Sequence, residues 1–376
     1  MKKILVNAIP MTVVGTGVGR YLRGLYVTLE KEFSDRLEIS YFTGKSIVRN
    51  IPNSEGPGWK EALGRMLWRM PYPVAFGARL LSHLPIERRF RSLSRDYHIY
   101  HEAAYFPFKA AARMPTVFTI HDLSLLRYPQ WHPRERVLYW RTFFKRRLGL
   151  ADSFCAVSEF TKREMVEYLD INPELIRVTP LGVDTDVFNP EHDEEAQAVL
   201  ESSGIPEEFI LFVGSGDPRK NFDALVNAVE KTQCQLPLVS VGWSGWSSGH
   251  EKTIINMGYV SDRMLAQLYR MATMLVMPSE YEGFGLPVVE AMACGCPVVI
   301  SSAAALVEVG GDAVIKVENV HDSNLLSCAI DDLAGSLSMQ IRLSGLGLKR
   351  AASFSWCDTA RGTAKVYLDD KYGQNL

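Results

Sequence analysis

Short apolar runs rich in β-branched residues alternate with longer segments of helical character through most of the chain. The runs include KKILVNAI, TVFTIHDL, SFCAVS, FILFVGSG, LPLVSVG, TMLVMPS and CPVVIS, and the helical segments include YLRGLYVTLEKEF, NFDALVNAVEK and DRMLAQLYRMA. Strands that alternate with helices form parallel sheets with helices on both faces. The sequence therefore predicts an α/β fold of the doubly wound class.

The alternating pattern runs twice, and a chain of 376 residues suits two domains better than one. The segment TPLGVDTDVFNPEHDEE, with its Gly, Pro and acidic residues, marks the connection between them. The chain through Phe188 holds 28 Lys+Arg against 19 Asp+Glu, and the remainder holds 13 against 24. Two halves of opposite charge indicate two domains that meet different partners.

Cysteine usage and the N-terminus indicate a cytoplasmic protein. The six cysteines form no Cys-x-x-Cys pair and no zinc-type cluster with histidine, so we expect reduced thiols. Asn7 and Pro10 interrupt the apolar run after the first lysines, which favours a first strand at 3–8 over a signal peptide. Nowhere do about eighteen apolar residues follow one another, so no membrane-spanning helix is expected.

Ligands of open parallel sheets bind beyond the carboxyl ends of the strands, so the residues after each apolar run are candidates. In SEYEGFGLPVVEAMACGCPVV, Glu282 lies in a turn between a strand and a helix, and Glu290 lies in the first turns of that helix. Free backbone N–H groups from about Phe284 to Val288 predict a phosphate site at the positive end of the helix dipole. The two carboxylates could accept hydrogen bonds from sugar hydroxyls and a ribose diol. In the alternative interpretation, Glu290 only favours the helix dipole and Glu282 is solvated.

The same stretch resembles the signature of retaining glycosyltransferases of family 4, whose two-domain architecture is called GT-B. The resemblance extends over nearly the whole chain. Its other segments are GTGVGR at 15–20, TIHD at 119–122, AVSEFTKRE at 156–164, PLGVD at 180–184, GDPRKN at 216–221, GYVSD at 258–262 and FSW at 354–356.

The resemblance implies two doubly wound Rossmann-like domains that face each other across a cleft. The first, at 1–185, would lie on the acceptor side, and the second, at 186–355, would bind the nucleotide sugar. A last helix at about 356–376 would return to the first domain. By the same resemblance, Glu282 would bind donor-sugar hydroxyls and Glu290 the ribose, and the amides of Phe284, Gly285 and Leu286 would meet the diphosphate and sugar.

The segment GSGDPRKNFDAL places Arg219 and Lys220 after a strand and at the start of a helix. Both would neutralise the diphosphate as the glycosidic bond breaks. The family often has an arginine directly after the strand-ending glycine, where this chain has Ser215, so Arg219 would have to substitute for it. The alternative is a pair of solvated charges at a helix start.

Other candidate residues follow strands of the first half. GTGVGR is no nicotinamide fingerprint, because Arg20 stands at its third glycine position and the next strand does not end in Asp or Glu. The resemblance places Gly17 near the donor phosphates and Arg20 on the acceptor side, with a plain tight turn as the alternative. His121 ends the strand TVFTI, and by the same resemblance it would position the donor sugar, with an ordinary surface or core histidine as the alternative, whereas the role of Asp122 is open. No general base is assigned, because the leaving phosphate is thought to take the acceptor proton.

Two further patterns concern metals and base recognition. The Asp-x-Asp at 184–186 is similar to the metal site of GT-A transferases, but it lies in the connection between the domains and not at a strand end. We therefore expect no metal. The nucleotide base would be recognised largely through backbone and loop contacts around Gly242 and Tyr259.

Basic residues and aromatics are mixed in two segments, which suits an anionic membrane surface. No nucleic-acid-binding motif accompanies them, and a solvated helix face is the alternative. The first segment holds Arg65, Arg69, Arg79, Arg88, Arg89, Arg91 and Arg95 among Trp59, Trp68, Tyr72 and Phe76, and the second is RERVLYWRTFFKRR at 134–147.

The predicted function is retaining, metal-independent transfer of a hexosyl unit from a nucleotide sugar to a saccharide or lipid-linked saccharide acceptor. The PRKN and EGFGLPVVEAMACG segments are most similar to bacterial mannosyltransferases of surface-polysaccharide synthesis, so GDP-mannose is the first candidate donor and no other cofactor is expected. The enzyme would act in the cytoplasm, at the inner face of the membrane. Alternatives are a UDP-sugar or dTDP-sugar transferase of the same fold, a GT-B-fold epimerase or phosphorylase, a metal-dependent GT-A transferase, and a non-catalytic nucleotide-sugar sensor.

Overall fold

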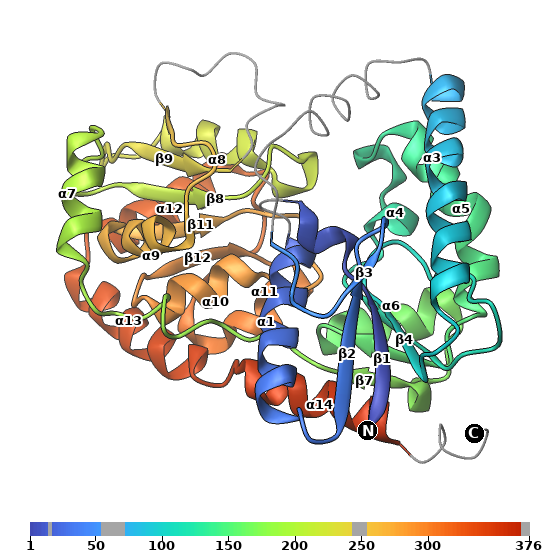
Figure 1. The fold of residues 1–376 in the computed structure, drawn as a ribbon. Helices are drawn as coiled ribbons and strands as arrows, with labels where there is room; N and C mark the ends of the chain where they lie inside the picture. The colour runs from blue at the N-terminus through green and yellow to red at the C-terminus, as the bar shows by residue number, and fades with distance from the viewer. Residues whose placement is uncertain (14–16, 54–71, 243–253, 370–376) are drawn as a thin grey trace. The chain divides into compact units, whose positions relative to one another are not determined.

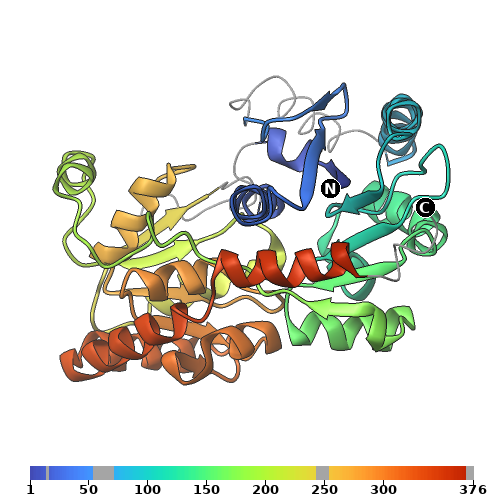
Figure 2. The same cartoon turned by 60° about the horizontal axis from the view of Figure 1, so that its bottom comes forward.

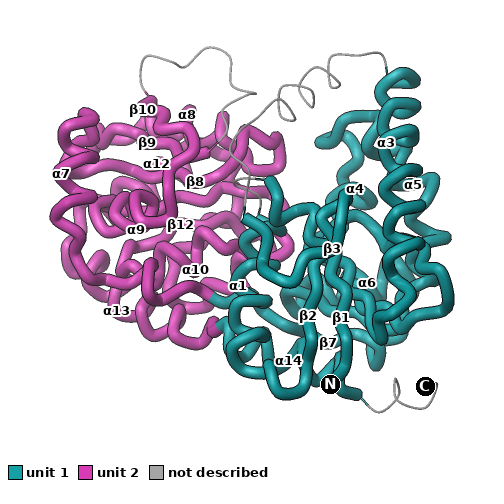
Figure 3. Tube along the Cα trace, viewed as in Figure 1, with its two compact units in different colours: residues 1–182, 356–376 teal, residues 183–355 magenta. Residues whose placement is uncertain are grey.

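The computed structural model describes residues 1–13, 17–53, 72–242 and 254–369. The chain divides into two compact units, shown in different colours in Figure 3. Unit 1 comprises Met1–Gly182 together with Trp356–Leu376, and unit 2 comprises Val183–Ser355. Each unit contains one sheet with helices packed against it (Figure 1), so the predicted α/β class is confirmed. The first segment of unit 1 ends at Gly182, and the domain boundary predicted from the sequence is at 185.

The sheet of unit 1 has the strand order β3-β2-β1-β4-β5-β6-β7. Neighbouring strands are parallel, except that the short edge strand β3 runs antiparallel to β2. The strands are β1 (Lys2–Asn7), β2 (Leu37–Phe42), β3 (Ile47–Val48), β4 (Ile99–Glu102), β5 (Thr116–Ile120), β6 (Ser153–Ala156) and β7 (Ile176–Val178). The apolar side chains of β4 and β5 are buried throughout, as expected for central parallel strands.

The helices of unit 1 include the last helix of the chain, α14 (Trp356–Leu368), which packs on α1 and β7 (Figure 2). The helix expected at 356–376 ends at Leu368, earlier than predicted. Residues 370–376 lie outside the described residues. The other helices are α1 (Gly17–Glu32), α3 (Tyr72–Leu93), α4 (Ser124–Arg127), α5 (Arg134–Leu148) and α6 (Glu159–Leu169), with 3-10 helices η1 (Ile9–Thr12), η2 (Pro129–Trp131) and η3 (Pro173–Leu175).

The sheet of unit 2 has the order β10-β9-β8-β11-β12-β13, with all pairs parallel. The strands are β8 (Ile210–Val213), β9 (Leu238–Val241), β10 (Ile254–Asn256), β11 (Met274–Met277), β12 (Val298–Ser301) and β13 (Ile315–Val317). The helices are α7 (Glu194–Ser202), α8 (Phe222–Val229), α9 (Asp262–Met271), α10 (Leu286–Ala293), α11 (Ala304–Gly310), α12 (Ser323–Ala334) and α13 (Leu337–Ala351), with η4 (Pro218–Lys220) and η5 (Gly311–Ala313).

The core of unit 2 shows why these segments form layers. Buried side chains of α8 and α12, among them Leu225 and Ile330, pack with strand residues such as Phe212 and Val276 in one cluster. The helix α10 contacts both α9 and α11. The N-cap residue Ser261 begins α9, and its side chain accepts the Met264 N–H.

Each sheet has one point at which the strand order reverses. In unit 1 this switch point lies between β1 and β4, and in unit 2 it lies between β8 and β11. Ligands of doubly wound folds bind outside the carboxyl ends of the strands at such a point. Among the helices of the described residues, none is long and apolar enough to cross a bilayer.

Candidate active site

The loops that follow β8 and β11 meet at the switch point of unit 2. Lys220 ends η4 after β8, and Glu282 lies in the turn between β11 and α10. The Lys220 Nζ forms an ion pair with Glu282 Oε1, although only 12% of the Lys220 side chain and 8% of the Glu282 side chain are exposed. The Glu280 N–H also donates to the Arg219 carbonyl oxygen at 2.8 Å. The structure thus brings the two predicted residues into contact, and Lys220 is not simply a solvated charge.

The charges around Glu282 keep its carboxylate ionised. Burial raises the pKa of Glu282, but the positive charges of Lys220 and Arg219 outweigh burial and lower the pKa below its ordinary value. Arg219 lies beside Lys220 in η4, and its Nε is 3.3 Å from Asp217 Oδ2. Asp217 is the N-cap of η4 and accepts the Arg219 N–H at 3.1 Å. Asp217 therefore fixes the position of the cation next to it.

The start of α10 offers backbone donors next to Glu282. Gly285 has φ +109°, and a Cβ there would lie 2.5 Å from Leu306 Cδ2, so only glycine fits. No acceptor is found within the described residues for the N–H groups of Phe284, Gly285 and Leu286. The predicted extension of this free stretch to Val288 is wrong, because Pro287 has no N–H and the Val288 N–H donates to the Gly285 carbonyl at 3.0 Å.

Glu290 lies further along α10 and is 2% exposed. Its Oε2 accepts a hydrogen bond from Tyr269 Oη of α9 at 3.1 Å. Because α10 has no acidic residue in its first turn, the helix dipole alone does not account for Glu290. Tyr269 was missed by sequence reasoning, because the helical pattern of α9 predicts only a core residue there.

The residues expected near the nucleotide base follow β9 and β10. Gly242 has φ +126°, and a Cβ there would lie 2.1 Å from the Gly214 carbonyl oxygen after β8. The Gly242 N–H donates to the Gly258 carbonyl oxygen at 2.7 Å, so the ends of these strands are joined through backbone atoms. Tyr259 follows Gly258 and is 62% exposed. The backbone and not a side chain sets the geometry here, which sequence patterns do not encode.

In unit 1, His121 follows β5 and its ring packs edge-on against Tyr21 of α1, with ring centres 4.8 Å apart. Burial lowers the pKa of His121 to about 4, while the charge of Asp122 and a hydrogen bond with the Ala103 backbone act in the opposite direction. Its Nε2 is buried and has no hydrogen-bond partner in the described part of the chain. His121 is therefore neutral at physiological pH and has an unsatisfied ring nitrogen.

The remaining predicted residues of unit 1 lie near the start of α1 or next to His121. Gly17 is the first residue of α1 and is exposed, with open space around its Cα. Arg20 is half-buried one turn further along the helix. Asp122 Oδ1 accepts the N–H of Ser124 at 2.9 Å and its hydroxyl at 2.6 Å, which is a local structural role. Gly15 and its neighbours at 14–16 lie outside the described residues.

The switch point of unit 1 holds a polar pair that sequence reasoning missed. Asn7 ends β1 and Glu102 ends β4, and Asn7 Nδ2 donates to Glu102 Oε1 and Oε2 at 3.0 and 2.9 Å. Glu102 also accepts the Ala104 N–H at 2.7 Å and the hydroxyl of Tyr100. Burial raises the pKa of Glu102 to about 7 despite these donors. Polar residues directly at the ends of strands were the signal that could have identified the pair.

The Asp-x-Asp at 184–186 lies in the connecting segment before α7. Asp184 Oδ1 accepts the Asp186 N–H at 3.1 Å, and both side chains are exposed. The motif therefore makes a local turn and does not end a strand.

The basic segments contribute both to the core and to the surface. Arg147 is buried and pairs with Glu87, and Arg79 pairs with Glu135, so these two arginines join α3 to α5. Phe76 packs on the core cluster of this unit. Trp59, Arg65, Trp68 and Arg69 lie outside the described residues. The exposed basic and large apolar residues are Tyr72, Val74, Leu81, Leu84, Arg88, Arg89, Arg91 and Leu93 of α3, Arg95 after it, and Arg134, Leu138, Arg141, Lys145 and Arg146 of α5.

Comparison with solved structures identifies the fold. Sucrose-phosphate synthase from Thermosynechococcus elongatus is 23% identical, with a TM-score of 0.72 over 98% of each chain. The Anabaena protein HepE, solved in complex with UDP and glucose, is 17% identical, with a TM-score of 0.69 over 98% of this chain and all of that one. The fold is GT-B, the two-unit α/β fold of nucleotide-sugar transferases.

Sequence comparisons identify the family. Residues 17–187 match the family described as Glycosyltransferase Family 4, and residues 207–335 match the family described as Glycosyl transferases group 1. The O-antigen chain mannosyltransferase B of Escherichia coli is 32% identical over 97% of this chain and 99% of its own length. The chain belongs to glycosyltransferase family 4. It is a hexosyltransferase that uses a nucleotide-sugar donor and a saccharide acceptor.

Proposed function

We propose that the protein transfers a mannosyl unit from GDP-mannose to a saccharide or lipid-linked saccharide acceptor in surface-polysaccharide synthesis. The observation that carries this proposal is the buried Lys220–Glu282 pair at the switch point of unit 2, with Arg219 beside it. A relative of nearly equal length is named an O-antigen chain mannosyltransferase, which supports both the sugar and the pathway class.

The geometry of unit 2 supports a division of roles. Lys220 and Arg219 neutralise the diphosphate leaving group, and charge stabilisation of this kind is often the largest single contribution to catalysis. Glu282, held ionised beside Lys220, accepts hydrogen bonds from the donor sugar. Glu290 binds the ribose diol. The N–H groups of Phe284, Gly285 and Leu286 donate to the diphosphate and sugar, and Gly242 and Tyr259 border the base.

We further propose that the anomeric configuration is retained and that no metal ion is needed. The side chains of Lys220 and Arg219 would supply two positive charges to the diphosphate, so charge compensation would not require a divalent ion. The leaving phosphate accepts the proton of the attacking hydroxyl, so no side chain serves as general base. His121 is neutral and positions hydroxyl groups, Gly17 lies near the donor phosphates, and Arg20 serves the acceptor.

The exposed arginines and apolar residues of α3 support contact with an anionic membrane at its cytoplasmic face. Val74 and Leu81 are 55% and 71% exposed, and Arg88, Arg89 and Arg91 follow on the same helix. Apolar side chains with adjacent cations suit the interface of an anionic bilayer. Replacement of the three arginines by glutamine should reduce sedimentation with phosphatidylglycerol vesicles. Equal sedimentation would leave α3 with a solvated face only.

Donor turnover tests the proposal directly. The protein is incubated in EDTA with GDP-mannose, UDP-glucose or dTDP-glucose and a mannose oligosaccharide, and the products are followed by ¹H NMR. We expect release of GDP and a new α-mannosidic signal with GDP-mannose alone. Turnover of a UDP-sugar would change the donor, a requirement for manganese would overturn metal independence, and a β-linked product would overturn retention.

A further inference from the structure

Tyr269 lies between the connecting segment of unit 2 and Glu290. It belongs to α9, is fully buried, and donates its hydroxyl to Glu290 Oε2 at 3.1 Å. A hydrogen bond from a hydroxyl group to an ionised carboxylate is stronger than one between neutral groups. This hydrogen bond restricts rotation about the three side-chain bonds of Glu290.

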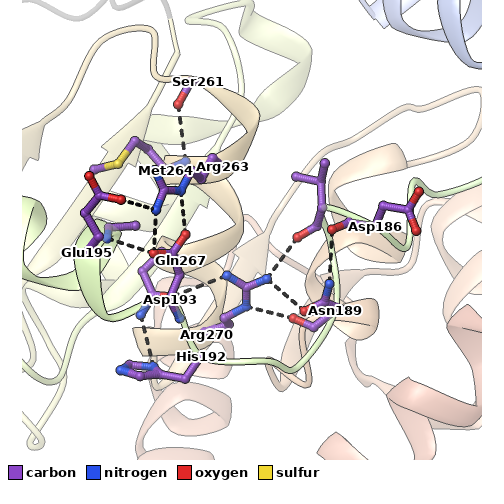
Figure 4. Close-up of polar contacts among 12 residues, drawn as sticks. Asp186, Asn189, His192, Asp193, Glu195, Ser261, Arg263, Met264, Gln267 and Arg270 are labelled. Carbon is purple, nitrogen blue, oxygen red and sulfur yellow. Dashed lines mark hydrogen bonds and ion pairs between the residues drawn. The ribbon is translucent and has the colours of Figure 1, made fainter.

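The other side of Tyr269 is held by the connecting segment 183–193. Phe188 is 4% exposed, and its ring packs edge-on against Tyr269 with centres 6.2 Å apart. Arg270, the next residue of α9, donates to the carbonyl oxygens of Val187 at 2.9 Å and Asn189 at 2.8 Å (Figure 4). The residues before and after Phe188 are therefore fixed to α9 through backbone atoms.

Further contacts extend this attachment to the end of the segment. Gln267 Oε1 accepts the Asp193 N–H at 3.2 Å, and Arg263 pairs with both Asp193 and Glu195 (Figure 4). The Arg263 pairs are exposed and add little stability on their own. The bonds of Arg270 and Gln267 to the backbone determine where Phe188 lies.

We propose that Tyr269 is a positioning residue for the donor: it fixes the Glu290 carboxylate in the orientation that binds the ribose diol, and Phe188 holds the Tyr269 ring in place. The inference rests on the proposed role of Glu290. Recognition of two neighbouring hydroxyls depends on the direction of both carboxylate oxygens, and a misplaced carboxylate loses this selectivity before it loses all affinity. Because Tyr269 is fully buried, it would act on the ribose through Glu290.

The test measures the preference for ribose over deoxyribose. Dissociation constants of GDP, UDP and their 2′-deoxy forms are determined by calorimetry for the wild type, Tyr269→Phe and Glu290→Gln. Tyr41→Phe is the matched control, because it removes a Tyr–Glu hydrogen bond of 2.6 Å to Glu30, in unit 1. We expect the wild type and the control to bind the ribose forms about tenfold more tightly than the deoxyribose forms. A hydrogen bond to a charged group changes a dissociation constant by about this factor.

Tyr269→Phe should lower the ribose preference to about twofold, close to the value for Glu290→Gln, and Phe188→Leu should give an intermediate value. A Tyr269→Phe variant that keeps the wild-type preference while Glu290→Gln loses it would overturn the inference and leave the proposed function intact. A wild type without ribose preference, or a Glu290→Gln variant that keeps it, would overturn the ribose role of Glu290 and this inference together. A wild-type preference in Phe188→Leu would remove the connecting segment from the account.

Discussion

The switch points of the two sheets have the same topology but differ in the charge of the side chains that they hold. In unit 2 the strand ends are bridged by a cation and an anion, Lys220 and Glu282, and the charged form of Glu282 is favoured. In unit 1 they are bridged by an amide and a carboxyl group, Asn7 and Glu102, and burial raises the pKa of Glu102 to about 7. The same arrangement of strands can thus hold a fully ionised pair or a carboxyl group that is only partly ionised at neutral pH.

The histidines of unit 1 extend this contrast. Burial lowers the pKa of His101 to about 3 and that of His121 to about 4. Both ring nitrogens of neutral His101 have hydrogen-bond partners. Its Nε2 lies 2.8 Å from Thr119 Oγ1, and its Nδ1 lies 2.7 Å from the hydroxyl of Tyr367 in α14. Both histidines are therefore uncharged at neutral pH, and the Nε2 of His121, which has no partner among the described residues, suits a hydroxyl ligand. The strand ends of unit 2 present charges, which suits a diphosphate.

Removal of the cation at the charged switch point should have the largest effect. Lys220→Ala should lower kcat by about a hundredfold or more, since loss of one preorganised group that stabilises developing charge has this magnitude. Donor turnover by the purified variant checks it. Lys231→Ala is the control, because Lys231 is exposed and bonds only at the surface of unit 2, to Ser323 and Asn324. Equal turnover by Lys220→Ala and the control would contradict the charged-site account.

Sequence reasoning reached the charged switch point but not the neutral one. Lys220 and Glu282 lie in motifs that directly follow β8 and β11. Because these two strands are neighbours in the sheet, the two side chains come close enough to form an ion pair. The fold class followed from the alternation of strands and helices. The pairing of β1 with β4 joins residues far apart in sequence, so the Asn7–Glu102 bridge depends on strand order that the alternation alone does not specify.

The neutral switch point should reveal itself through pH. The folded state raises the pKa of Glu102 from an ordinary 4.5 to about 7, so between these values the native state binds more protons than the unfolded state. Wild-type stability therefore falls as pH rises through this window, and Glu102→Gln lacks this term. From pH 4.5 to 7.5 the unfolding free energy of Glu102→Gln should improve relative to the wild type by about 3 kcal/mol.

Urea unfolding of both proteins at a series of pH values measures this difference. Glutamine places an N–H₂ group against the donors of Asn7 and Ala104, so the variant can be less stable at every pH. The change with pH, and not the absolute value, is the prediction. A difference that is constant from pH 4.5 to 7.5 would show that Glu102 is ionised throughout.

The smallest effect concerns His121. Its low pKa keeps the ring neutral, so it should contribute no titration to activity between pH 5.5 and 8. The rate of His121→Asn should be lower than that of the wild type, and the ratio of the two rates should stay constant within about twofold over this range. A ratio that changes with a midpoint near pH 6.5 would mean that the imidazole is protonated during the reaction.

The same comparison explains which parts of the site could not be predicted. The sequence pattern predicts too long a stretch of free backbone N–H groups, because the Val288 N–H bonds to the Gly285 carbonyl oxygen. This hydrogen bond depends on the left-handed backbone conformation of Gly285. The partner of Glu290 was missed because Tyr269 lies on another helix and reads as a core residue. The first depends on the backbone conformation of one residue and the second on a contact between two helices, and the local sequence patterns indicate neither.

We expect the charged switch point of unit 2 to bind the diphosphate of a nucleotide sugar without a metal ion. Melting temperatures of the wild type and Lys220→Ala are compared in EDTA with millimolar GDP, UDP, dTDP or guanosine, because a ligand of the native state stabilises it. The account predicts a clear rise for the wild type with GDP, a smaller rise for Lys220→Ala, and little effect of guanosine. Equal shifts with GDP and guanosine, or a shift that appears only after manganese is added, would contradict it.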